Sequence, residues 1–355
     1  MIIILVALIC TVFIGVKFRK SDNLDSYLDR DYTTSIIGVF AVIIFFSHFF
    51  GYMDQTPMNK LDEIASFTTS ALGQLMVVPF LFFSGYGVFE QFKKKGAGYA
   101  SSLPKNRIFK VYLMFFISWL LYVALSFVLK TIFTPKEYII SAFGIVSIGN
   151  SNWYVVVILA LYLSTYLSIK FGSTEKMALA INIVLCSLLI LILKNRDLDP
   201  AWWNTIASYA FGLVYSYFKP RILAFYKKHK ANRWIVLALS ISLTSLFGIL
   251  DFTVASEPYG LFYLLMELSF CMTFASLLSV TIIGNKIILT LGKYCFWIYI
   301  LQRISMRIFY QVPAIRGNVY VYFLLCAVVT AILAFSVEKL FNLIWSLINR
   351  KKKRA

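Results

Sequence analysis

Long apolar segments follow one another along almost the whole of this 355-residue chain. Hydrophobic residues make up 60% of it and charged residues only 14%, which leaves more apolar surface than a soluble core can bury. A helix needs about 20 apolar residues to cross the hydrocarbon core of a bilayer. Windows of this kind occur at 2–18, 33–53, 69–91, 108–131, 152–172, 177–194, 203–218, 234–250, 258–282, 287–311 and 319–346. They predict an all-α fold, a polytopic transmembrane helical bundle of about ten core spans plus an N-terminal anchor helix.

Two of these windows, 2–18 and 203–218, are marginal in length, and whether the first crosses the membrane stays open. The apolar stretch 138–149 is too short for a span and predicts an outer-leaflet or re-entrant piece. Short loops join the segments, so we expect one membrane bundle without a separate soluble domain. The parts are an N-terminal membrane anchor and cytoplasmic linker (1–32), a transmembrane domain (33–346) and a basic cytoplasmic tail (347–355).

Lysines and arginines gather in alternate connections between the apolar segments. The clusters are Arg19-Lys20, Lys93 to Lys110, Lys170 to Lys176, Lys219 to Arg233 and Arg350 to Arg354. Because positive charge concentrates in cytoplasmic loops, this pattern predicts a cytoplasmic C-terminus and an N-terminus outside. The same bias explains the net charge of +18, which favours contact with anionic membrane lipid and gives no reason to expect a nucleic acid partner. The five cysteines lie in apolar stretches without metal-ligand spacing, so we expect packing roles for them.

Few ionisable side chains lie inside the apolar segments, and such residues are functional candidates because their burial in lipid is costly. His48 is one of only two histidines in the chain. It follows about 15 residues of its segment, which places it roughly 22 Å across the bilayer, in the outer half. Glu267, Gln302 and Arg303 fall at a similar depth. These polar groups either line a common cavity, or Glu267 and Arg303 form a structural ion pair.

Another polar group of residues is expected at the cytoplasmic side. The run Phe82 to Gly87 leads to a basic loop, and Arg107 and Lys110 open the next apolar segment. Residues three apart share one face of an α-helix, so the two cations could hold the phosphates of a nucleotide-like donor. Topology alone offers the other explanation, since positive charge is expected on this side in any case.

In this order the motifs resemble the acyltransferase 3 family of membrane proteins, which includes O-acetyltransferases of bacterial surface polysaccharides. The matching motifs, which together cover residues 33 to about 345, are Phe45-Phe46-Ser47-His48, Phe82 to Tyr86 with Arg107 to Tyr112, Asn152-Trp153-Tyr154, and Leu291 to Tyr299. The family commonly carries Arg or Lys eleven positions before the histidine, where this chain has Ile37. It often has a second histidine where this chain has Gln302.

The resemblance implies transfer of an acyl group, most often acetyl, from cytoplasmic acyl-coenzyme A to a hydroxyl of an exported or cell-surface glycan, or of a lipid-linked glycan. The protein would lie in the bacterial plasma membrane, use acetyl-coenzyme A as a donor substrate, and need no bound cofactor or metal. His48 would be the catalytic base. The expected donor-binding residues are Arg107, Lys110, Ser84 and Tyr86, and the expected acceptor cavity is formed by Glu267, Gln302, Arg303, Trp153 and Asn152.

Two other functions compete with this interpretation. A polytopic transporter or flippase of a lipid-linked glycan would fit the same spans, although transporters are often built from repeated halves and no convincing repeat is found here. A catalytically silent relative is the second alternative, because Ile37 replaces the expected cation. Oligomeric state, acyl chain length and the identity of the acceptor stay open.

Overall fold

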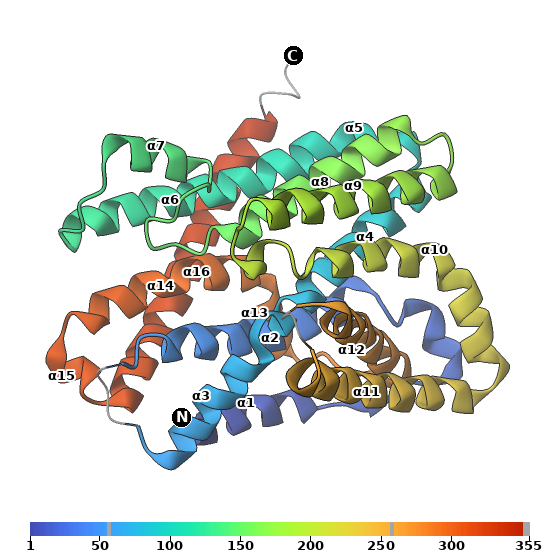
Figure 1. Ribbon diagram of the computed structural model, residues 1–355, viewed down its shortest axis with the longest axis horizontal. Coiled ribbons are helices and arrows are strands. Elements are labelled where there is room, and N and C mark those ends of the chain that lie inside the picture. Colours follow the sequence, from blue (N-terminus) through green and yellow to red (C-terminus); the bar gives the residue numbers. More distant parts are fainter. Residues whose placement is uncertain (55–57, 256–258, 351–355) are drawn as a thin grey trace.

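The computed structural model of the chain describes residues 1–54, 58–255 and 259–350 (Figure 1). The α-helices are α1 (Ile2–Phe13), α2 (Arg30–Phe50), α3 (Lys60–Leu72), α4 (Val78–Lys95), α5 (Ala97–Leu103), α6 (Lys110–Val128), α7 (Pro135–Ala142), α8 (Trp153–Phe171), α9 (Glu175–Asn195), α10 (Ile206–Lys228), α11 (Lys230–Thr253), α12 (Leu261–Val280), α13 (Lys286–Lys293), α14 (Cys295–Tyr310), α15 (Pro313–Arg316) and α16 (Val319–Arg350). Short 3-10 turns are η1 (Ser21–Ser26), η2 (Gly73–Met76) and η4 (Pro200–Trp202), and η3 (Pro104–Phe109) is a π-helix. The strands β1 (Lys17–Phe18) and β2 (Thr281–Ile282) pair antiparallel.

Each apolar segment singled out in the sequence coincides with helix, and the all-α polytopic bundle is confirmed. Within the described ranges, eight helical units are long and apolar enough to cross a membrane, or nine when the bent pair α13–α14 is taken as one span. Helix α1 has 12 residues and a length of about 18 Å, which is short of the roughly 30 Å hydrocarbon core. Helix α10 is long enough but carries Pro220 and several lysines. The tail residues 351–355 lie outside the described residues.

A single continuous span over 287–311 was expected, and this prediction is wrong. Helices α13 and α14 meet at Tyr294, whose backbone is not helical, and their axes differ by 75°. The bend frees backbone groups that lipid could not satisfy, so it is tolerated only where protein surrounds it. Here α13 packs on α2 and α14 on α16.

Two helices cross closely at the centre of the bundle. Gly85 of α4 faces the carbonyl of Tyr209, and Gly212 of α10 faces the carbonyl of Phe82, with no room for a side chain at either position. Small residues of this kind let membrane helices approach closely. In Figure 1, α4 runs through the middle of the molecule, with α8 and α9 on one side of it and α11 and α12 on the other. The crossing fixes the direction in which the polar residues of α4 point.

The linker after α1 is held to the end of α12 by two buried arginines. Arg19 donates through Nε to the carbonyl of Leu278, and Arg233 donates to the carbonyls of Ser279 and Arg19. The carbonyls of Leu278 and Ser279 belong to the last turn of α12, where acceptors have no partner within the helix and the dipole favours a cation. The contacts therefore fasten α11, α12 and the N-terminal linker together.

Candidate active site

His48 lies in the last turn of α2, and the side chain of Gln302 on α14 holds it. The Gln302 Nε2 atom lies 2.8 Å from His48 Nδ1 and 3.0 Å from the carbonyl oxygen of Tyr299, to which it donates. The ring of Tyr299 lies 6.0 Å from that of His48. Gln302 is fully buried, whereas His48 keeps part of its surface exposed. The sequence placed His48 and Gln302 at one depth, and the structure brings them into contact.

The direction of this hydrogen bond determines the tautomer of the imidazole. An amide nitrogen donates and cannot accept, so Gln302 Nε2 leaves His48 Nδ1 as the acceptor. A neutral ring then carries its proton on Nε2. Only an amide turned to present Oε1 would accept from Nδ1–H and leave Nε2 free as a base.

Several buried polar atoms close to His48 have no hydrogen-bond partner among the described residues. They are Gln302 Oε1, Arg303 Nε and the hydroxyls of Tyr299 and Ser151, and these two hydroxyls lie next to each other without the geometry of a full hydrogen bond. Arg303 lies within electrostatic reach of both His48 and Tyr299. Because buried polar groups are almost always satisfied, these atoms mark a place for a polar ligand or for water.

The connection before α8 is held to α14 by Arg307. Arg307 donates from Nη1 to the carbonyl of Ile148 at 2.9 Å. Gly149 beside it has φ of +103°, and a side chain there would collide with the Arg307 guanidinium. Asn152, predicted for the acceptor cavity, holds the same connection by donating to the carbonyl of Gly144. Arg307 therefore fastens the connection before α8 to α14.

Helix α8 begins with two aromatic residues that connect the His48 site to an apolar pocket. Trp153, also predicted for the acceptor cavity, packs edge-on against the next residue, Tyr154, and Tyr154 packs against Tyr299 with ring centroids 5.5 Å apart. An apolar pocket of about 70 Å³ lies against these two tyrosines. It is lined by Ile44, Val77, Phe80, Tyr154, Cys295, Phe296 and Tyr299. The pocket and the His48 site thus share the side chain of Tyr299.

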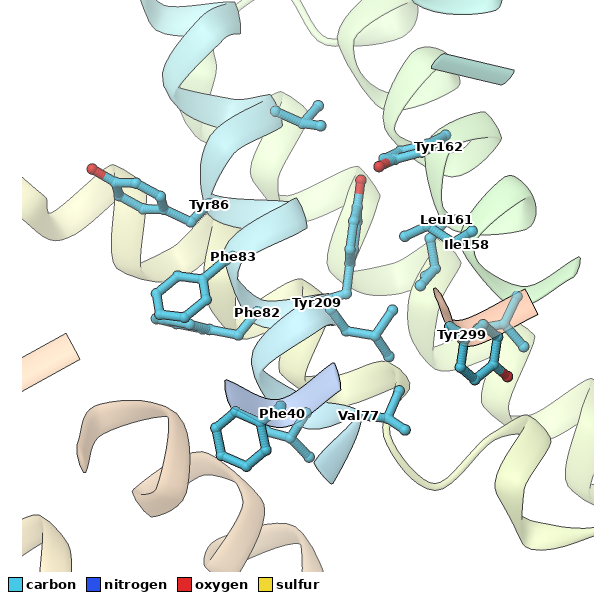
Figure 2. Close-up of a cluster of buried hydrophobic side chains, with 14 of the residues drawn as sticks. Phe40, Val77, Phe82, Phe83, Tyr86, Ile158, Leu161, Tyr162, Tyr209 and Tyr299 are labelled. Atoms are coloured by element: carbon cyan, nitrogen blue, oxygen red, sulfur yellow. The ribbon is translucent and has the colours of Figure 1, made fainter. Parts of the chain in front are cut away.

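A second polar group lies farther along α4 and α8. The Ser84 hydroxyl lies 2.7 Å from the hydroxyl of Tyr162, and the Arg107 guanidinium lies 5.8 Å above the Tyr162 ring. Figure 2 shows Tyr162 and Tyr209 with their hydroxyl groups turned toward each other. Within the described ranges Arg107 forms no ion pair, which leaves its charge available for an anion. The structure therefore brings Ser84 and Arg107 together through Tyr162.

Lys110 does not join this group, although Arg107 and Lys110 were expected on one helix face. Its ammonium lies 5.6 Å from the ring of Phe341 and 5.7 Å from that of Trp345, both on α16. Arg107 belongs to the π-helix η3, and a π turn holds more residues than the 3.6 of an α-helix. The wider turn rotates the two side chains toward different neighbours.

Tyr86 lies apart from Ser84, Tyr162 and Arg107, and Figure 2 shows it on the other side of α4 from Tyr162. Its hydroxyl accepts from Lys219 Nζ at 2.7 Å. Glu90 pairs with Lys93 and lies 3.8 Å from Lys219. Beside them, burial raises the pKa of Tyr27, so this phenol stays neutral at physiological pH. Glu90 is thus the carboxylate partner of both Lys93 and Lys219.

Glu267 of α12 is fully buried and lies against α10. Its Oε1 accepts from the backbone N–H of Ser208 at 2.9 Å, in the first turn of α10, where a carboxylate complements the helix dipole. Among the described residues it makes no ion pair with Arg303 and no hydrogen bond to Gln302. The hydrogen-bond partner of Glu267, Ser208, is thus different from the partner of His48, Gln302.

Comparison with known proteins decides the family. A family model described as an acyltransferase domain matches residues 37–338, nearly the whole chain. The chain belongs to the acyltransferase 3 family. No curated protein and no solved structure matches it. For this acyltransferase the eight apolar helical units and the family together indicate a multi-pass membrane protein.

Sequence reasoning missed several residues of this acyltransferase that surround the site. Ser151 and Tyr154 flank the predicted pair Asn152 and Trp153, and Tyr162 lies two helical turns farther along α8. A hydroxyl that recurs on one face of an apolar helix is the signal that could have found Tyr154 and Tyr162, because residues eight apart lie close to one face.

Proposed function

We propose that this acyltransferase transfers an acyl group from cytoplasmic acyl-coenzyme A to a hydroxyl of an exported or cell-surface glycan, and that the acyl group is acetyl. The observation that carries the proposal is the contact of His48 with Gln302 in a site whose buried polar atoms lack partners. An acceptor hydroxyl needs such a site, because its proton must pass to a base as its oxygen attacks. The bacterial plasma membrane is the proposed location, with the N-terminus outside and the C-terminus in the cytoplasm.

The donor would enter from the end of the bundle that carries Arg107. An unpaired guanidinium next to tyrosine hydroxyls suits a coenzyme A phosphate, since its planar fork can donate two parallel hydrogen bonds. Ser84 and Tyr162 add two hydroxyls at the same place. Lys110 and Lys219 would contribute long-range positive potential without touching the phosphate at Arg107. Tyr86 would act there only through its hydrogen bond from Lys219.

The reaction exchanges one acyl bond for another. The acceptor oxygen forms a bond to the thioester carbonyl carbon, and the carbon–sulfur bond breaks. The hydroxyl proton passes to His48 Nε2 and from there to the departing sulfur, which leaves as the thiol. For this step Gln302 would present Oε1 to Nδ1–H, and Arg303 would stabilise the negative charge on the tetrahedral oxygen.

The proposal is tested by acyl transfer from radiolabelled acetyl-coenzyme A to endogenous glycan in membranes that carry the parent protein. The variant His48→Ala removes the base, and His229→Ala is the matched control, because it changes the only other histidine, an exposed one. We expect label with the parent and the control, and a loss of at least about 100-fold with His48→Ala.

Two results would count against the proposal. Undiminished transfer by His48→Ala would remove His48 as the base. Absence of transfer by the parent, with a panel of glycan acceptors supplied, would favour a catalytically silent relative.

A further inference from the structure

The apolar pocket next to His48 has a size that suits only a small group. We infer that this pocket holds the acyl group of the donor during transfer and restricts the enzyme to short acyl chains, with Phe80 as the residue that sets the limit. The inference rests on the proposed acyl-coenzyme A donor. It is argued from the position, lining and volume of the pocket.

The pocket lies between the two polar groups. It shares Tyr299 with the site of His48, and Ile44, in its wall, lies one helical turn before His48 on α2. Val77 directly precedes α4 and Phe80 lies in its first turn, one turn before Ser84. A donor whose phosphates contact Arg107 would therefore reach His48 by passing this pocket.

The lining is chemically suited to the tail of an acyl group. Five of the seven lining side chains are apolar, namely those of Ile44, Val77, Phe80, Phe296 and Cys295, and the thiol of Cys295 is the weak hydrogen-bonding group among them. The two tyrosines, Tyr154 and Tyr299, pack ring against ring at 5.5 Å. An apolar pocket of this kind is dry and gains free energy when a methyl or methylene group fills it.

Its volume sets the length of chain that fits. The pocket is partly open and has a volume of about 70 Å³, whereas an apolar cavity of about 150 Å³ in a protein accommodates the six carbon atoms of benzene. In proportion, about three non-hydrogen atoms fit, which is the size of an acetyl group. Each further methylene would have to displace a packed wall at a cost of about 1–3 kcal/mol.

Phe80 is a large wall residue whose ring contact is with Tyr154, so its shortening opens space in the pocket and leaves the contacts of His48 with Gln302 and Tyr299 in place. Its ring packs edge-on against Tyr154 at 6.3 Å and is only partly buried. Phe83, one helical turn farther on α4, is buried in the core against Phe82 and lines no part of the pocket. Phe80→Leu and Phe83→Leu thus form a matched pair on one helix.

The test measures transfer from acetyl-, propionyl- and butyryl-coenzyme A with the full-length protein in membranes. We expect the parent and Phe83→Leu to prefer the acetyl donor, and Phe80→Ala to raise the ratio of butyryl to acetyl transfer at least about tenfold. Phe80→Leu and Val77→Ala, which remove less volume, should raise it less and keep the inference testable where Phe80→Ala does not fold.

An unchanged ratio in every Phe80 and Val77 variant that still transfers acetyl would overturn the inference and leave the proposed function intact. The same is true of a parent that uses butyryl as well as acetyl. A parent that transfers none of the three acyl groups would instead overturn the proposed function, and the pocket assignment with it.

Discussion

The side-chain amide of Gln302 governs which nitrogen of His48 is free. Its nitrogen donates to Nδ1 and to the carbonyl of Tyr299, while its oxygen has no partner. For His48 to act as the proposed base, the amide would have to take the other orientation, which leaves Nε2 unprotonated. Where the resemblance to the family implies a second histidine, this chain has Gln302 in contact with His48.

The variants Gln302→Glu and Gln302→Leu test this role. A carboxylate only accepts, so Gln302→Glu would place the proton on Nδ1 and should keep acetyl transfer near the parent level, with Arg303 nearby to balance the charge. Gln302→Leu cannot orient the ring and should lower transfer about 10- to 100-fold. Nitrogen-15 NMR of His48 in the His229→Ala background, where it is the only histidine, reports the tautomer directly. Full activity and an unchanged spectrum in Gln302→Leu would contradict the assignment.

Gly149 allows a second prediction for a single residue. A methyl group there would lie 1.9 Å from Arg307 Nη1, on a backbone whose φ of +103° suits glycine. We expect Gly149→Ala to lower the free energy of unfolding by about 1–3 kcal/mol and to loosen the connection before α8. The measurement is thermal unfolding in detergent. Gly87→Ala is the control, because nothing lies within 4 Å of a side chain at that helical position, and it should unfold at the parent temperature or above.

At the scale of helices, hydropathy predicted where the elements lie but not how they bend. Apolar windows identified α2, α8, α11 and α16 because helix length in a bilayer is set by its thickness. The bend between α13 and α14 lies within the apolar window 287–311 and leaves no hydropathy signal. The π turn Pro104–Phe109 lies in a basic stretch, where hydropathy carries no information about the geometry of the turn. The contacts of the site depend on how these elements pack, which is why Tyr162 and the different directions of Arg107 and Lys110 emerge only from the structure.

The π turn leads to a prediction about donor binding. Arg107 lies over Tyr162 beside Ser84, whereas Lys110 lies against the aromatic rings of α16. Arg107→Gln should therefore raise the KM for acetyl-coenzyme A about tenfold or more, with a smaller effect on kcat. Lys110→Gln should change KM less than about threefold, and Arg107→Lys should restore it only in part, because lysine lacks the planar fork. Equal effects at the two positions would mean that charge alone matters.

At the scale of the whole molecule, the polar groups and the pocket form a sequence across the bundle. One end of this series is the polar group of Arg107, Tyr162 and Ser84. The pocket lined by Tyr299 is next, and the other end is His48 with its unpartnered neighbours. Such an order is useful only if coenzyme A, an intracellular donor, reaches the Arg107 end. In Figure 1 the connections α8–α9 and α10–α11, each flanked by lysines at the ends of the joined helices, lie at one end of the bundle, and α7 and α15 lie at the other.

The orientation can be measured with a membrane-impermeant maleimide and two single substitutions. Lys94 lies exposed at the end of α4, near the basic loop, and Lys136 lies exposed on α7 at the opposite side. In a Cys10→Ser background, which removes the exposed native thiol, Lys136→Cys should react in intact cells and Lys94→Cys only after permeabilisation. The reverse pattern would put Arg107 outside, where no coenzyme A is present, and would exclude a cytoplasmic donor even if His48 proved essential. The labelling experiment thus decides the direction of transfer independently of the chemistry at His48.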